Sequence, residues 1–350
     1  MARKKQSLFG LLGKSKSMRS EEYLNVIQRL RLVIILVMLA SLGVFIFVAV
    51  YFGLLKVINI ISASNLLLWG LAFVFVFLGY VIRFGKWRYY MGLIGIKLPI
   101  LQNFSIYMSL YSMNITPGRV GRIIAGYTIN RVTGEKFMTI APAVTMDIFS
   151  DFFGFALLAL ITSFFFHRLF IYVLIFVIML SISFLVIIDQ RLYKFIIKGK
   201  REKLFKRFIP HINRYYSSQN NLNRPSVYLT SILFTLPADI LNSSALYLVL
   251  LSVGVHASLI TVIFIFAAAQ IFGMVSTLPG SVGVADVTMI ALLGTMLDLS
   301  GPLSTAATIM ARTATLWFGV IVGTIFLIYT TKYWTIKSAT KKSTGKKRIH

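Results

Sequence analysis

Six long apolar stretches constrain this chain most, because each is about as long as a helix that crosses a lipid bilayer. They lie at about residues 32–55, 66–84, 138–166, 169–188, 226–253 and 303–331. A hydrocarbon core about 30 Å thick needs about 20 consecutive apolar residues in a helix. The whole chain is 57% hydrophobic and only 13% charged, which excludes an ordinary soluble domain. We therefore predict an all-α polytopic membrane protein with about six full transmembrane helices.

A short helix-breaking motif occurs twice, as Thr-Pro-Gly-Arg-Val-Gly at residues 116–121 and as Leu-Pro-Gly-Ser-Val-Gly at 278–283. Proline and glycine both oppose helix continuation, so a break is predicted at each copy. Apolar stretches at about 98–113 and 257–277 lead directly into the motifs, and each is either a full span or one arm of a re-entrant hairpin. The hinge positions of the two breaks are predicted to be Pro117, Pro279, Gly280 and Gly283.

The charge distribution favours the hairpins. The chain has 36 Lys and Arg against 10 Asp and Glu, a net charge of +26. In a membrane protein such an excess is typical of cytoplasmic loops facing anionic lipids, and we expect no nucleic-acid partner. Only a hairpin at 98–134 keeps the basic linker (189–225) on the same side as both termini; the stretch 254–302, which lacks Lys and Arg, then enters from outside. This arrangement assigns the following cations to the cytoplasmic side: Arg83, Lys86, Arg88, Lys97, Arg131 and Lys136.

The two halves of the chain can be superposed as an inverted repeat, residues 66–166 on 226–331. Phe153-Gly154 then falls on Phe318-Gly319, and Asp147 lies opposite Arg312. Inverted repeats are typical of proteins that alternate access across a membrane. We expect a basic cytoplasmic segment (1–31), a transmembrane domain (32–332) and a basic cytoplasmic tail (333–350) in a multi-pass protein of the cell membrane.

The first motif carries the strongest candidate binding groups. Arg119 and Arg122 lie on this tip beside the amides of Gly118 and Gly121 and the start of a helix predicted at about 122–130. Guanidinium groups, open amides and a helix N-terminus together favour an anion such as phosphate. The alternative is that both arginines reach the cytoplasmic headgroups and only anchor the hairpin.

Charged residues within apolar segments are the other candidates, because an isolated charge in a membrane is costly. Asp147 and Asp151 are one helical turn apart and share a face. They are predicted to oppose Arg119 or Arg122 or to couple protons, or else to form a structural ion pair between the repeats. Asp286 is expected to pair with Arg312, and a structural pair is the favoured interpretation.

Metal and thiol chemistry have little support. The chain has no cysteine and only four histidines, none at the spacing of metal ligands. We expect neither a cofactor nor a metal.

Together, the Pro-Gly motifs, the Asp147–Asp151 pair and Arg312 resemble the transmembrane domain of lysylphosphatidylglycerol synthases and their stand-alone, flippase-like (UPF0104) relatives. The resemblance covers roughly residues 30–332, although Arg122 stands where the family usually has Glu. It implies movement of charged lipids between leaflets. It does not imply aminoacylation, which belongs to a separate soluble domain of the synthases.

The leading hypothesis is therefore a membrane lipid translocase for an anionic or charged lipid, such as a phospholipid or a polyprenyl phosphate. The alternative is a membrane glycosyl or phosphoryl transferase that acts on a polyprenyl phosphate with Asp147 and Asp151 at its site. A scaffold that gathers anionic lipids would explain the charge but not the repeated breaks. We do not expect an enzyme, because no catalytic or metal motif is evident in the sequence.

Overall fold

The computed structural model describes residues 49–116, 121–122, 124–188 and 209–334, together with residues 39, 43, 46 and 47. Every regular element within these ranges is helical, which confirms the predicted all-α class. The elements are α3 (Leu54–Ser62), α4 (Leu66–Leu93), α5 (Ile100–Ser109), the 3₁₀ turn η1 (Leu110–Met113), α6 (Ile124–Thr133), α7 (Phe137–Ser163), α8 (His167–Ile188), α11 (Ile209–Leu222), α12 (Pro225–Ser252), α13 (Leu259–Val275), the turn η3 (Pro279–Ser281), α14 (Val284–Met296), α15 (Gly301–Arg312), the π-helical turn η4 (Thr313–Trp317), α16 (Phe318–Tyr329) and a second π-helical turn, η5 (Thr330–Trp334).

Five stretches of described helix are long and apolar enough to cross a membrane: Leu66–Leu93, Phe137–Ser163, Pro225–Ser252, Pro279–Met296 and Gly301–Lys332. The predicted span at 32–55 falls largely outside the described residues. The apolar span predicted at 66–84 lies within α4, which continues as a helix to Leu93. Beyond residue 84 the helix carries Lys86, which is buried, and Arg88, which is exposed.

The longest helices form the centre of the molecule. Asn65 caps the N-terminus of α4, and its side chain accepts hydrogen bonds from the amides of Leu67 and Leu68 at 3.0 and 3.3 Å. Such a cap satisfies amides that the first helical turn leaves unpaired. α4 packs along α12, while α7 packs against α11, α12 and α13. α11 lies within the predicted linker and buries Tyr216 and Leu222.

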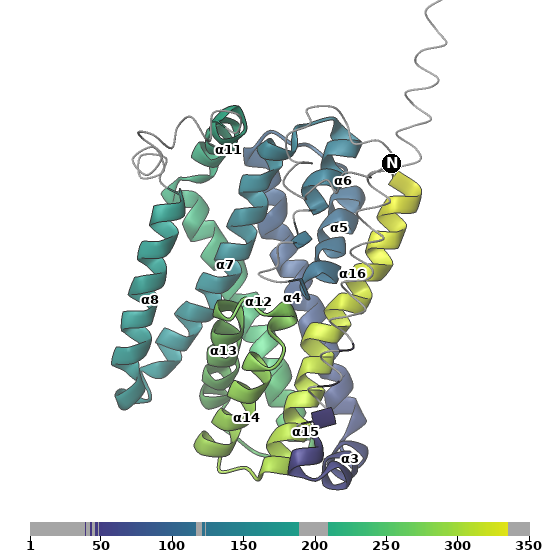
Figure 1. Ribbon diagram of the computed structural model, residues 1–350, viewed down its shortest axis with the longest axis vertical. Helices are drawn as coiled ribbons and strands as arrows, with labels where there is room; N and C mark the ends of the chain where they lie inside the picture. Colours follow the sequence, from purple (N-terminus) through teal and green to yellow (C-terminus); the bar gives the residue numbers. More distant parts are fainter. Residues whose placement is uncertain are drawn as a thin grey trace, which may run out of the picture.

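Two helix pairs occupy opposite ends of this frame. Figure 1 shows α5 and α6 in the upper half of the view, and α13 and α14 in the lower half. Their connecting segments approach each other, since a Cβ built on Gly280 would lie 3.6 Å from the Cα of Ile115. Ile115, directly before the first motif, therefore lies beside Gly280 of the second motif, although 165 residues separate these two positions in sequence.

The last long helix is interrupted by a π-helical turn near the middle of the molecule. α15 ends at Arg312 and is followed by η4 and then by α16. Tyr80 of α4 donates a hydrogen bond to the carbonyl of Thr315 within this turn at 3.0 Å. π-helical turns are rare and occur frequently at functional sites.

Gly323 permits close packing of α16 on η1. A Cβ at this position would overlap the Ser112 amide nitrogen and lie 2.7 Å from the carbonyl carbon of Tyr111. These atoms belong to the main chain and cannot turn aside, so Gly323→Ala is expected to destabilise the protein by about 1–3 kcal/mol. Thermal unfolding in detergent measures this effect.

Gly70→Ala is the matched control for this packing prediction. Gly70 is exposed in α4, and no atom lies within 4 Å of an added Cβ. Its replacement is expected to leave the unfolding temperature unchanged or to raise it slightly, because alanine favours helix. Equal unfolding temperatures for Gly323→Ala and the unmodified protein would contradict this close packing of α16 on η1.

Candidate functional site

Six buried ionisable side chains meet in the middle of the molecule. The six-charge cluster consists of three cations and three carboxylates: Arg83, Lys86, Arg122, Asp147, Asp151 and Asp239. None of these residues is more than 4% exposed. Buried charges are tolerated only when they are paired and hydrogen-bonded, and equal numbers of the two signs satisfy this requirement.

Lys86 is the most enclosed cation of the cluster. Its Nζ lies 2.9 Å from Asp151 Oδ1 and 3.2 Å from Asp147 Oδ1. It also donates hydrogen bonds to Ser150 Oγ at 2.6 Å and to Thr235 Oγ1 at 3.3 Å. Lys86 therefore joins α4 to both α7 and α12 through one ammonium group.

Arg122 approaches the same two carboxylates from the first helix break. Its Nη1 lies 2.8 Å from Asp147 Oδ2 and 3.3 Å from Asp151 Oδ2. Its Nε donates to Asn114 Oδ1 at 3.0 Å, and its guanidinium lies over the Tyr111 ring, 5.6 Å from the ring centroid. Asp147 and Asp151 meet both cations because one helical turn separates them on α7.

Arg83 completes the cluster on the side of α12. Its Nη2 donates to Asp239 Oδ1, and its Nε lies 3.4 Å from Asp151 Oδ1. Gly154 of α7 lies directly beside this contact, and a Cβ there would overlap Asp239 Oδ2. The missing side chain therefore allows Asp239 to reach the cluster.

A second ion pair lies at the other helix break. Arg312 Nε is 2.7 Å from Asp286 Oδ1, which is the pairing expected from the sequence. Arg312 Nη2 also donates to the carbonyl of Gly280 at 2.7 Å, and Asp286 Oδ2 accepts from the amide of Gly283 at 2.8 Å. Gly280 and Gly283 have φ angles of 64° and 85°, which glycine adopts without a steric penalty.

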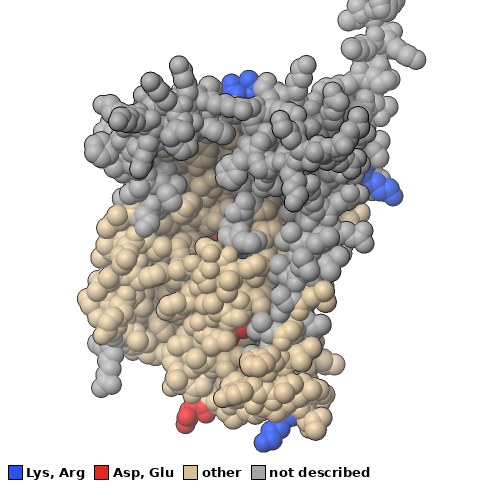
Figure 2. All heavy atoms as spheres, viewed as in Figure 1, with Lys and Arg blue, Asp and Glu red and all other residues tan. Residues whose placement is uncertain are grey.

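A cavity of about 70 Å³ connects the two sets of charges. Among the described residues that line it are Arg83, Arg122 and Arg312 and one acidic residue, Asp151. We call it the cationic cavity. Figure 2 shows the surface of the described residues. In its tan middle band, acidic atoms are visible only inside hollows.

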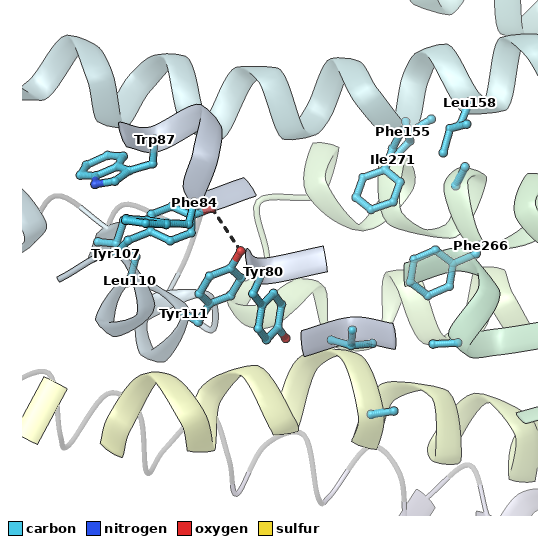
Figure 3. Close-up of a cluster of buried hydrophobic side chains, with 14 of the residues drawn as sticks. Tyr80, Phe84, Trp87, Tyr107, Leu110, Tyr111, Phe155, Leu158, Phe266 and Ile271 are labelled. Atoms are coloured by element: carbon cyan, nitrogen blue, oxygen red, sulfur yellow. Dashed lines mark hydrogen bonds between the residues drawn. The ribbon is translucent and has the colours of Figure 1, made fainter. Parts of the chain in front are cut away.

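Aromatic rings enclose the cationic cavity from two sides. Figure 3 shows Tyr80 and Tyr111 within one group of rings and Phe155 and Phe266 within another, and all four line the cavity. The centroids of the Tyr80 and Tyr111 rings are 4.0 Å apart, and Tyr111 shares a 3.2 Å hydroxyl contact with Tyr107. These rings place apolar surface beside the charges, which lowers the local dielectric constant and strengthens the electrostatic interactions inside.

The structure brings together several residues that the sequence analysis selected. Arg122, Asp147 and Asp151 share the six-charge cluster, while Asp286 and Arg312 form the second ion pair. Pro279 opens η3 and Gly280 lines the cationic cavity. Pro117, Gly118 and Arg119 lie outside the described residues.

The expected role of one glycine amide was wrong. The Gly121 amide, expected to be open to a ligand, donates to Thr116 Oγ1 at 2.8 Å. A Cβ on Gly121 would lie only 2.7 Å from Thr116 Cγ2 and 2.9 Å from Met113 Cβ. Gly121 therefore serves the close packing of the loop rather than an open anion site.

Sequence reasoning counted Arg83 and Lys86 only as loop cations of the cytoplasmic side and missed that both are buried in the six-charge cluster. The spacing of Arg83, Lys86 and Tyr90 contains the missed signal, because steps of three and four residues keep all three on one helical face. Asp239, a charge within the apolar stretch 226–253, was not among the predicted site residues. Within the described ranges, no group of three His, Asp or Glu side chains is arranged to hold a metal ion.

Comparison with known proteins gives one match. The family model described as the lysylphosphatidylglycerol synthase TM region matches residues 30–323, which is most of the chain. No curated protein matches the chain. The match includes both helix breaks, the six-charge cluster and the Asp286–Arg312 pair.

Proposed function

Since the chain belongs to the family of lysylphosphatidylglycerol synthase transmembrane regions, we propose that it moves a lipid with a charged, phosphate-bearing headgroup between membrane leaflets. The observation that carries this proposal is the cationic cavity, where Arg83, Arg122 and Arg312 converge. Arginine binds phosphate through paired N–H donors, and its interactions strengthen when water is excluded. The headgroup would occupy this cavity during its passage.

In this proposal the two helix pairs are re-entrant hairpins that enter from opposite faces of the membrane. Their location at opposite ends of the molecule and the proximity of Gly280 to Ile115 support the arrangement. Irregular backbone is tolerated at membrane depth where it is buried in protein or lines a polar cavity. Both conditions apply to segments that line the cationic cavity.

Equivalent glycines support an inverted repeat. The sequence superposition places Gly154 opposite Gly319. Gly154 lies against Asp239 of α12, and a Cβ on Gly319 would lie 2.6 Å from the Tyr80 hydroxyl of α4. α4 and α12 occupy corresponding positions in the two repeats, so each glycine faces the long helix of the other repeat. Rocking between such repeats is the proposed route of alternating access.

Partner exchange among the buried charges would accompany headgroup entry. Arg122 already lies within 3.3 Å of both Asp147 and Asp151. A phosphate that approaches Arg122 can take over one of these contacts, while Lys86 continues to neutralise the released carboxylate. The cluster thereby accepts an anion without leaving a carboxylate unpaired.

The second tip supplies a strained segment for movement. Thr277 and Ser281 have φ angles of 52° and 57°, values that residues with a Cβ rarely adopt. Strain of this kind is concentrated at ligand clamps and switch regions. We therefore assign the tip around η3 as the moving part of the outer hairpin.

We propose translocation rather than group transfer because the candidate catalytic carboxylates are already engaged. Asp147 contacts Lys86 and Arg122, and Asp151 contacts these two cations as well as Arg83. A metal-dependent transferase would need such carboxylates to be open to a metal or to a reacting group.

Proteoliposomes that contain fluorescent lipids test this proposal. The unmodified protein is expected to expose inner-leaflet lipids with phosphate-bearing charged headgroups to an external quencher faster than protein-free vesicles do. The double variant Asp286→Asn/Arg312→Gln removes one cation from the cavity and keeps the buried charges balanced. Its rate is expected to fall about tenfold or more, because a hydrogen bond to a charged group contributes about 1.5–3 kcal/mol.

The control is Lys56→Gln/Asp298→Asn, which makes the same change of charge at two exposed positions. It is expected to retain the full rate. The proposal fails if the unmodified protein moves none of the tested lipids faster than protein-free vesicles, or if the buried double variant retains full activity while folded.

A further inference from the structure

A second cavity adjoins the cationic cavity and differs from it in chemistry. Its volume is about 210 Å³. Phe149 and Phe152 of α7 form part of its wall, and Met274 and Val275 of α13 form another part. Among the described residues that line it, none is charged. We call it the apolar cavity.

The two cavities meet at the helix breaks. Asn114, two residues before the first motif, and Ser281, within the second motif, line both of them. A phosphate held by the arginines would therefore lie next to an apolar space rather than next to a closed wall. This combination matches a ligand in which a charged group is attached directly to a hydrocarbon chain.

The apolar cavity opens toward the side of the protein. Its lining residues Val275 and Leu278 are 51% and 45% exposed, although both are apolar. Val275 is the last residue of α13 and Leu278 follows it in the loop, in the middle of the molecule, where apolar side chains face lipid in a membrane protein. A chain can therefore enter laterally between α7 and the tip that follows α13.

We propose that the apolar cavity holds one hydrocarbon chain of the lipid whose phosphate enters the cationic cavity, an inference that rests on the proposed function. The lipid thus passes with part of one chain inside the protein, rather than with its headgroup alone inside. An apolar cavity of about 150 Å³ accommodates benzene, so 210 Å³ takes a chain segment of about eight carbons. That volume admits one chain and not two.

Alkyl phosphates of increasing length test this inference on the purified full chain in detergent. Inorganic phosphate is the probe without a chain, and alkyl trimethylammonium ions of the same lengths correct for partition into micelles. Affinity is expected to rise with each methylene, up to about fourfold per group as in transfer from water, and to level off near eight carbons.

Met274→Trp fills the apolar cavity and provides the decisive comparison. In this variant affinity is expected to level off at a shorter chain, while binding of inorganic phosphate is unchanged. Phe272→Trp is the matched control, because Phe272 lies on the same helix, is 56% exposed and does not line the cavity. This control is expected to reproduce the unmodified curve. If Met274→Trp does not fold, Met274→Ala enlarges the space and is expected to extend the rise to longer chains.

Two results would overturn the inference: identical chain-length curves for the Met274 variant and the Phe272 control, or a phosphate series no steeper than the ammonium series. The proposed function is tested separately by the vesicle assay. Length-dependent binding without lipid movement would leave the apolar cavity assigned and reject translocation. Lipid movement with binding that does not depend on chain length would support translocation and reject the assignment of the apolar cavity.

Discussion

Lys86→Met is expected to leave little stably folded protein after extraction into detergent. The substitution removes the ammonium that lies within 3.2 Å of both Asp147 and Asp151, so that the cluster keeps two cations for three carboxylates. Loss of one partner from a buried ion pair costs about 3–5 kcal/mol, because the remaining charge has neither water nor a counter-charge. Net stabilities of proteins are only about 5–15 kcal/mol. Size-exclusion profiles and thermal unfolding measure the effect.

A second substitution distinguishes charge from packing. Lys86→Met/Asp147→Asn removes one charge of each sign and leaves two cations with two carboxylates. The double variant is expected to recover most of the stability that the single variant loses. Arg88→Met is the control on the same helix, since Arg88 is exposed and its replacement is expected to have little effect. A double variant as unstable as the single one would instead attribute the role of Lys86 to its hydrogen bonds with Ser150 and Thr235.

The sequence predicted the helical class and several buried contacts for identifiable reasons. Long apolar stretches require helices in a membrane, because only helices and closed barrels satisfy their own backbone there. Asp147, Asp151 and Arg312 stood out because charges within apolar segments are rare and need partners. Their spacing and their proximity to the helix breaks indicated which groups would meet.

The sequence is ambiguous for Lys and Arg, because these residues either flank a membrane span or form buried ion pairs. Arg83 and Lys86 follow a long apolar run, and a loop-charge rule counts such cations as flanking residues. α4 continues past them, and its face carrying these cations is buried against α7 and α12. The partner Asp239 lies 156 residues beyond Arg83, and no local pattern specifies a contact over that separation. The Gly121 amide likewise donates a hydrogen bond to Thr116 within the loop, and composition does not predict this contact.

A tether between the two helix breaks is expected to abolish lipid movement reversibly. The natural chain contains no cysteine, so a single engineered pair gives an unambiguous crosslink. A Cβ on Gly280 would lie 3.6 Å from the Cα of Ile115, so the two backbones approach closely enough for a disulfide. In Ile115→Cys/Gly280→Cys, oxidation is expected to stop movement of fluorescent lipids in proteoliposomes, and reduction is expected to restore it.

This result follows if the two tips separate as a headgroup passes between the repeats, since a covalent bond of about 2 Å cannot stretch to follow them. Each single-cysteine variant is the control, because it has one of the substitutions without a crosslink and should respond to neither oxidant nor reductant. Gly280→Cys also introduces a side chain at a φ of 64°, so its lower basal rate sets the reference for the double variant. Fully crosslinked protein that still moves lipid at that reference rate would exclude separation of the tips from the transport cycle. The lipid would then have to pass around a fixed centre.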